Sequence, residues 1–169
     1  MPMPTLMRIM EDVFISSISW LQTSTAKVIR RGITHIVIPE NLIDNQIRDK
    51  FEIYAIPAHI EELPHPKEVP VNPFAALPGI MDFLRRAALF KGRVLFIESN
   101  TDWTSVSNSS MEQKCLLVRE CMLMCLAAIY QTSAYDTYTL IKSQNLFFTI
   151  EARRLQTISE WTQLCASVN

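Results

Sequence analysis

The stretch Val94-Leu95-Phe96-Ile97-Glu98 decides the fold. Its first four residues are apolar and include β-branched and aromatic types, a run that predicts a short strand buried on both faces. A helical pattern of apolar residues precedes it over residues 78–90 and is ended by Gly92. Residues 99–110, which follow it, are rich in Ser, Thr and Asn, as loops are. We therefore expect a central strand that ends in a polar loop.

Shorter patterns fill the half of the chain that precedes this strand. Residues 12–15 predict a short strand, and residues 23–31 predict a helix. Two further strands are predicted over residues 33–39 and 51–56. Five prolines between residues 57 and 73 exclude both a central strand and an unbroken helix, so we expect a long surface loop there.

Three helices are predicted after the polar loop, over residues 111–130, 133–144 and 149–165. The second half of the first helix, residues 121–130, carries no charge, so we expect it to be buried on all sides. Strands that alternate with helices predict an α/β fold with a central, mostly parallel sheet flanked by helices. We expect residues 1–169 to form a single domain.

The composition is typical of a chain with a substantial core and little net charge. Of the 169 residues, 49% are hydrophobic, and 16 Lys and Arg residues balance 17 Asp and Glu residues to a formal charge of -1. A chain of this length buries roughly 70% of the surface that it exposes when unfolded, so neither disulfides nor a structural metal is required. Because there is no basic excess, we do not expect nucleic acid as the main ligand.

Neither a secretion signal nor a membrane span is predicted. Residues 1–21 contain Arg8, Glu11 and Asp12 and an apolar run interrupted by serines, which is not the pattern of a signal peptide. The longest uncharged run, residues 121–135, is too short to cross a bilayer. We expect a soluble chain of the cytoplasm or nucleus that makes no contact with membranes.

The four cysteines are Cys115, Cys121, Cys125 and Cys165. Cys121 and Cys125 would share one helical face, but two thiols do not make a closed tetrahedral zinc site, and no histidine lies near them in the sequence. We interpret the cysteines as buried structural thiols and expect neither a metal nor another cofactor.

Three local stretches, in order and at suitable spacing, resemble the dual-specificity protein tyrosine phosphatases. Gly32-Ile33-Thr34-His35-Ile36-Val37 resembles the strand entry of that family, and Tyr54-Ala55-Ile56-Pro57 resembles the strand end before its general-acid loop. Leu126-Ala127-Ala128-Ile129-Tyr130 resembles its central helix. The resemblance extends over most of the chain and implies the same α/β fold.

The diagnostic motif of that family is altered in this sequence. The family carries His-Cys, five residues, then Arg and Ser or Thr, and its cysteine attacks a phosphate that its arginine grips. By this resemblance, Ile97 stands at the histidine and Glu98 at the nucleophile. Counting onward without a gap puts Thr101 at the loop glycine, Thr104 at the arginine and Ser105 at the hydroxyl residue.

Counting backward from the buried helix instead puts Glu120 at the arginine position, with Arg119 beside it, sixteen residues away from the first count. The general-acid aspartate of the family maps to Ile60. A carboxylate at Glu98 would also repel a phosphate, by roughly 4 kcal/mol for two unit charges at about 4 Å and an effective dielectric constant near 20. The resemblance implies an inactive member, similar to the serine/threonine/tyrosine-interacting pseudophosphatases, and we expect no enzymatic activity.

We therefore expect a protein-binding scaffold or adaptor that recognises an unphosphorylated surface of another protein. The proline-stiffened residues 57–73 would lose little conformational entropy on docking, and an aromatic side chain in a polar loop can serve as an anchor. The candidate partner-binding residues are His59, Leu63, His65, Val69, Val71, Phe74 and Trp103. The alternative for these residues is packing against their own domain.

A phosphopeptide reader without turnover is the first of the other interpretations. Arg119 or Lys114 could replace the arginine of the family, unless both are solvated charges at the start of a helix.

RNA binding is a further possibility that we do not expect. Arginine pairs at residues 30–31, 85–86 and 153–154 offer cations to RNA, but cations are ordinary near helix ends and on exposed faces.

The second of the other interpretations is an enzyme of another class. Glu98, together with Asp102, His59 or Glu61, could act as an acid and base in the former cleft. Catalysis by one of the cysteines is not expected, because no basic residues follow them at the spacing that phosphate binding requires.

Overall fold

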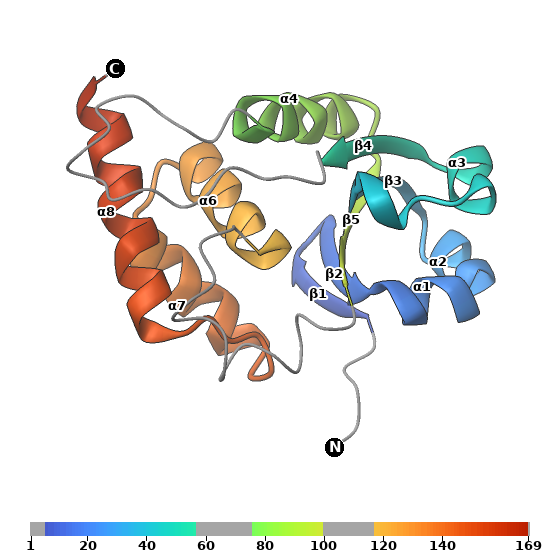
Figure 1. The fold of residues 1–169 in the computed structure, drawn as a ribbon, viewed down its shortest axis with the longest axis horizontal. Coiled ribbons are helices and arrows are strands. Elements are labelled where there is room, and N and C mark those ends of the chain that lie inside the picture. The colour runs from blue at the N-terminus through green and yellow to red at the C-terminus, as the bar shows by residue number, and fades with distance from the viewer. Residues whose placement is uncertain (1–5, 57–75, 100–116, 169) are drawn as a thin grey trace.

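The structure is a computed structural model that describes residues 6–56, 76–99 and 117–168. The described residues contain one five-stranded sheet with the strand order β1-β2-β5-β3-β4 (Figure 1). The strands β2, β5, β3 and β4 run parallel to one another, and β1 pairs antiparallel with β2 at one edge. The strands are β1 (Met7–Met10), β2 (Val13–Ser17), β3 (Ile33–Pro39), β4 (Glu52–Ile56) and β5 (Arg93–Glu98). The predicted mostly parallel sheet with a central β5 is confirmed.

Helices cover both faces of this sheet (Figure 1). The short helices α1, α2 and α3 pack on one face, and α4, α6, α7 and α8 lie on the other. The helices are α1 (Ile18–Thr23), α2 (Thr25–Arg30), α3 (Asn45–Lys50), α4 (Ala76–Leu89), α6 (Val118–Tyr130), α7 (Ala134–Gln144) and α8 (Ala152–Val168), with a 3₁₀ turn at Glu40–Leu42. The α/β class predicted from the sequence is therefore confirmed.

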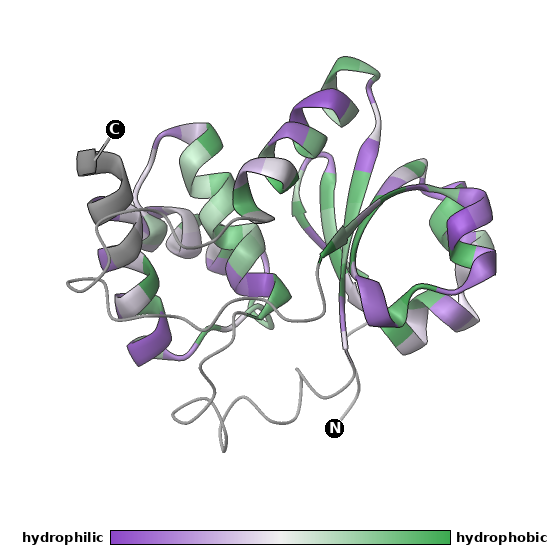
Figure 2. Ribbon diagram, turned by 45° about the horizontal axis from the view of Figure 1, so that its top comes forward, coloured by the Kyte–Doolittle hydropathy of each residue, from purple (hydrophilic) through white to green (hydrophobic). Residues whose placement is uncertain are grey.

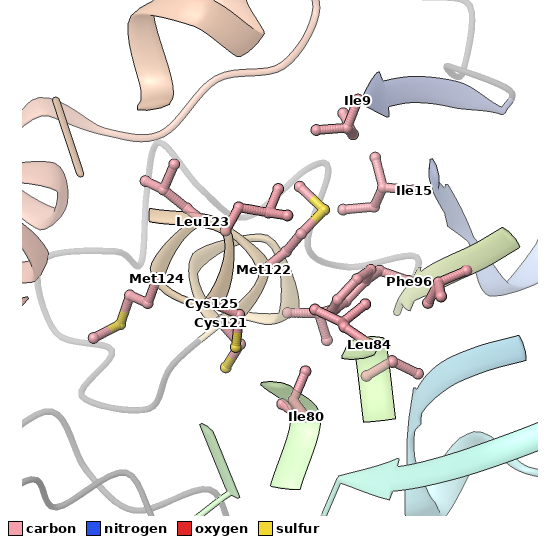
Figure 3. Packing of buried hydrophobic residues seen from close by; sticks show 14 of the residues in the cluster. Ile9, Ile15, Ile80, Leu84, Phe96, Cys121, Met122, Leu123, Met124 and Cys125 are labelled. Carbon is pink, nitrogen blue, oxygen red and sulfur yellow. The ribbon is translucent and has the colours of Figure 1, made fainter. Parts of the chain in front are cut away.

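Two hydrophobic cores result, one on each face of the sheet. The larger core is built around α6, whose Met122 faces Ile15 and Phe96 of the sheet and whose Cys125 lies toward α4 (Figure 3). The smaller core lies between the sheet and the helices α1, α2 and α3, and includes Leu21. The strands show hydrophobic colouring along most of their length in Figure 2, as expected for a sheet covered on both faces.

The helix α6 begins later, and is less completely buried, than its sequence predicts. Leu117 has an extended backbone with φ -83° and ψ 154°, so the helix begins at Val118 rather than at residue 111. Burial continues as far as Ala127, but Ala128 and Tyr130 are exposed, which corrects the expectation of a helix buried on all sides to residue 130. Apolar composition alone did not show that the last turn projects from the core.

Three short elements were not predicted from the sequence, namely β1, α1 and α3. Each has only four to six residues, too few for a period in hydrophobicity to stand out. Two of them begin at side-chain caps: Ser17 accepts a hydrogen bond from the Trp20 N–H, and Asp44 accepts one from the Ile47 N–H. The helix predicted over residues 23–31 corresponds to α2, which begins at Thr25, and Ser24 separates it from the unpredicted α1.

The start of α4 also differs from its prediction. The helix begins at Ala76 rather than at Pro78, which is its third residue. Proline is tolerated there because the N–H groups of the first turn have no partner within the helix. The predictions for the loop at residues 57–73 and for most of the polar loop at residues 99–110 lie outside the described residues.

Cys121 and Cys125 are free, buried thiols on α6, as predicted. Burial raises the pKa of Cys121 well above its ordinary value and that of Cys125 to about 12. Cys115 and the side chain of Cys165 lie outside the described part. Among the described residues, no helix has the length and apolar character that crossing a membrane requires, and no cluster of His, Cys, Asp and Glu could hold a metal ion.

Candidate functional site

The candidate site lies where β5 ends, at the edge at which the parallel strands present their carboxyl ends. Ligands of open α/β sheets bind outside this edge. Glu98 is the last residue of β5 and pairs in register with Ser17, the last residue of β2. Both residues are buried, and Ser17 also caps α1 through its hydroxyl group. The end of the central strand thus places a carboxylate below the protein surface.

Arg119, in the first turn of α6, binds this carboxylate through two parallel hydrogen bonds. Its Nε donates to Glu98 Oε2 at 2.7 Å, and its Nη2 donates to Glu98 Oε1 at 2.8 Å. The side chains are 2% and 0% exposed, respectively. This fork-to-fork geometry is the strongest form of an arginine–carboxylate pair, and burial protects it from screening by salt.

The segment between α7 and α8 fixes the other side of Arg119. Its Nη1 donates to the carbonyl oxygen of Thr149 at 2.7 Å, and its guanidinium carbon lies 5.6 Å from the centre of the Phe148 ring. The ring is fully buried, so the contact combines packing with a cation–π interaction. Three separate segments of the chain, β5, α6 and the α7–α8 connection, therefore meet at one guanidinium group.

A second buried ion pair lies beside the first. Glu120 is fully buried and accepts hydrogen bonds from Nε of Arg154 and, at 2.5 Å, from Nη2 of Arg154. Its Oε1 also accepts the backbone N–H of Leu117 at 2.8 Å, which satisfies a donor at the start of α6. Because Arg154 belongs to α8, this pair attaches α8 to the first turn of α6.

These contacts correct three expectations drawn from the sequence. Arg119 is not a solvated charge at a helix start, and Arg154 is not on an exposed face, since both are buried and bonded to carboxylates. The expected repulsion of a phosphate by Glu98 assumed an uncompensated negative charge. This assumption is wrong, because the Glu98–Arg119 pair is neutral overall. The sequence did contain one signal for a cationic partner. Glu98 ends a strand that is predicted to be buried on both faces, and a buried carboxylate needs a partner of opposite charge.

Of the site residues predicted from the sequence, Ile97 and Glu98 lie within the described part, and both are fully buried on β5. In the structure, Glu98 forms an ion pair with Arg119. From the sequence, Arg119 was considered only as an alternative phosphate ligand. The predicted site residues outside the described ranges are His59, Ile60, Leu63, His65, Val69, Val71, Phe74, Thr101, Trp103, Thr104 and Ser105. Phe148 and Thr149 were not predicted to take part, because their role depends on a backbone carbonyl and on a ring contact that no motif records.

No protein-family model matches the sequence, and no curated protein matches it. Solved structures do match. Human tyrosine phosphatase-like serine/threonine/tyrosine-interacting protein has a TM-score of 0.66 and 15% identity, with 95% of this chain and 97% of that chain covered. A leucine rich repeat and phosphatase domain containing protein from Entamoeba histolytica has a TM-score of 0.64 and 12% identity, with coverages of 98% and 95%.

Human DUSP28 has a TM-score of 0.61 and 16% identity, with 96% of this chain and 97% of that chain covered. At such identities the matches carry information on the fold and not on the chemistry of individual residues. Their coverage nevertheless extends over almost all of both chains in each comparison. This chain has the fold of the dual-specificity protein tyrosine phosphatases.

Proposed function

We propose that this chain is a catalytically inactive, protein-binding domain built on the dual-specificity phosphatase fold. The observation that supports the proposal is the buried pair at the end of β5, where Glu98 occupies the end of the central strand and binds Arg119 through both of its oxygens. In active members, by the resemblance described above, this place belongs to a cysteine nucleophile. The nucleophile and the free phosphate-binding arginine are, in this proposal, both replaced.

The chemistry of the available nucleophiles supports an inactive domain. A carboxylate can attack phosphorus in some enzymes, but both oxygens of Glu98 already accept hydrogen bonds from a guanidinium, which reduces their nucleophilicity. Cys121 and Cys125 are buried, and their raised pKa values keep them protonated at neutral pH. Neither Cys121 nor Cys125 therefore offers the thiolate that phosphate transfer needs.

Binding of a phosphopeptide through Arg119 is disfavoured by the same pair. The guanidinium would have to leave Glu98, and a buried carboxylate without its partner costs about 3–5 kcal/mol. We therefore assign the recognition of an unphosphorylated partner to this domain. The sequence places apolar candidates for that contact at Leu63 and Phe74 in the proline-rich segment, and at Trp103.

Hydrolysis of 4-nitrophenyl phosphate by the full chain tests the absence of catalysis. We expect the wild-type protein and Glu98→Gln, purified in the same way, to show the same background rate. Because glutamine keeps the shape of the side chain, we expect the variant to remain folded, and circular dichroism checks this. Turnover by the wild type that disappears in Glu98→Gln would overturn the proposal and favour an enzyme that uses this carboxylate.

Capture of a protein from lysate tests the binding function. We expect a stoichiometric partner to be retained by the wild type and lost on Leu63→Ser/Phe74→Ser, and to be retained equally after the lysate is treated with a broad phosphatase. The matched control is Leu146→Ser/Phe147→Ser, which changes an exposed apolar pair in the α7–α8 connection. Capture that depends on phosphate in the partner would contradict recognition of an unphosphorylated surface.

A further inference from the structure

The end of α4 carries two consecutive large apolar residues in solvent. Leu89 and Phe90 are each 80% exposed. In Figure 2 the end of α4 and the turn after it form a projecting tip with hydrophobic colouring. An exposed pair of this size at a projecting point is typical of a surface that contacts another molecule.

A cavity of about 230 Å³ lies at the same end of α4, and Ala88, which directly precedes this pair, forms part of its wall. It lies between the ends of α4 and α6 and the turn that joins β1 to β2. Most of its wall is apolar, and the residues that form this part of the wall include Leu84, Ala87, Ala88, Val94, Leu126 and Ile129. Its volume is sufficient for large apolar side chains such as those of Leu89 and Phe90, and it lies apart from the Glu98–Arg119 pair.

The charges around the cavity have opposite signs on its two sides. Arg85 lies on the α4 side, followed along the chain by Arg86 and Lys91, whereas Glu11 and Asp12 lie in the β1–β2 turn. Two of these charges already have partners at the surface, Arg86 with Asp82 at 3.1 Å and Asp12 with Arg93 at 3.3 Å. Exposed pairs of this kind contribute little and can exchange partners when another surface approaches.

We infer that this face binds a second copy of the same chain through a twofold axis. Leu89 and Phe90 of each copy enter the cavity of the other, and the cations of each α4 end meet Glu11 and Asp12 of the other copy. A twofold interface requires one surface that is complementary to itself. Here the projecting residues lie beside the cavity, and the cations lie beside the carboxylates. The inference does not depend on the proposed function.

Sedimentation over roughly micromolar to submillimolar concentrations tests the inference on the full chain. We expect a reversible monomer–dimer equilibrium for the wild type. Leu89→Asp/Phe90→Asp removes the projecting anchors and weakens the dimer by at least about 30-fold, the loss associated with interface hot spots. The matched control, Leu146→Asp/Phe147→Asp, alters another Leu-Phe pair that is 75% and 73% exposed, and leaves the dimer unchanged.

Ala88→Trp provides a second test, because it fills the mouth of the cavity and keeps the projecting pair. We expect this variant to dimerise weakly by itself, as the anchor variant does, whereas a mixture of the two regains one intact anchor–cavity contact and associates more strongly than either alone. A wild type that stays monomeric throughout the concentration range overturns the inference, and then a different protein would have to cover this face. The inference is also overturned if the control substitutions at Leu146 and Phe147 weaken the dimer and those at Leu89 and Phe90 do not.

Discussion

Three groups from two segments hold Arg119: the carboxylate of Glu98 on β5, and the carbonyl of Thr149 and the ring of Phe148 in the α7–α8 connection. A guanidinium and a carboxylate lose several kcal/mol of hydration each when they are buried, and their attraction offsets this loss only when their geometry is good. The pair therefore adds little net stability, but it strongly disfavours any state in which one member is missing. Such a pair fixes the position of α6 relative to β5 more than it strengthens the fold.

A double-mutant cycle at residues 98 and 119 tests this account. We expect Glu98→Leu and Arg119→Met to lower the free energy of unfolding by about 3–5 kcal/mol each, because each leaves an unpaired buried charge. The double variant should lie within about 1 kcal/mol of the wild type, since it buries two apolar side chains instead. Urea unfolding followed by circular dichroism measures all four proteins. Losses that simply add in the double variant would show that the two charges do not act as a pair.

At the scale of whole elements, long uninterrupted apolar runs were predictable and short or capped elements were not. The strand β5 and the buried body of α6 follow from uncharged stretches in the sequence. The start of α6 does not follow from the sequence in this way. The carboxylate of Glu120 accepts the N–H of Leu117, but it also needs Arg154, which lies 34 residues later in another helix. The Glu98–Arg119 contact likewise joins residues 21 positions apart, on the two sides of residues 100–116, which lie outside the described part. A glutamate at the end of a buried strand indicates that a cation is needed, but no local pattern names Arg119 or Arg154 as the partner.

The helix α6 also makes stability depend on alkaline pH. Burial raises the folded-state pKa of Cys121 and brings that of Cys125 to about 12, compared with an ordinary value of 9.0. The unfolded chain therefore loses these thiol protons first as the pH rises. The stabilisation is fully present below pH 9 and is lost progressively toward pH 12.

We expect the free energy of unfolding to fall by about 1 kcal/mol per thiol between pH 8 and 10, as measured by urea unfolding at each pH. Cys121→Ala/Cys125→Ala should have a flatter pH profile, even though the smaller side chains lower its stability at every pH. Tyr54, whose pKa is raised by burial and also by Cys125, is present in both proteins, so the part that comes from burial is common to the two profiles. Identical slopes in the two proteins would contradict the assignment to the thiols.

Across the whole molecule, one sheet forms a wall of both cores. On β5 successive side chains enter opposite cores: Phe96 packs with α6, and Leu95 and Ile97 pack on the side of α1, α2 and α3. The same alternation occurs on β3, where Val37 belongs to one core and Ile38 to the other. Loss of either helical layer would expose half of the side chains of each central strand to water. The two cores are therefore expected to form and to unfold together.

This coupling predicts that the chain unfolds as a single cooperative domain. Leu21→Ala, on the α1 side, and Leu123→Ala, in α6, each remove a fully buried side chain and should each cost about 2–5 kcal/mol. If the sheet couples the cores, both substitutions lower the midpoint of the same transition, and calorimetric and van't Hoff enthalpies agree for the wild type and both variants. Far-ultraviolet circular dichroism and tryptophan fluorescence should then give coincident curves. If Leu123→Ala instead splits the unfolding curve into two transitions, one of which keeps the wild-type midpoint, the two sides of the sheet unfold independently, and the single-domain prediction is wrong.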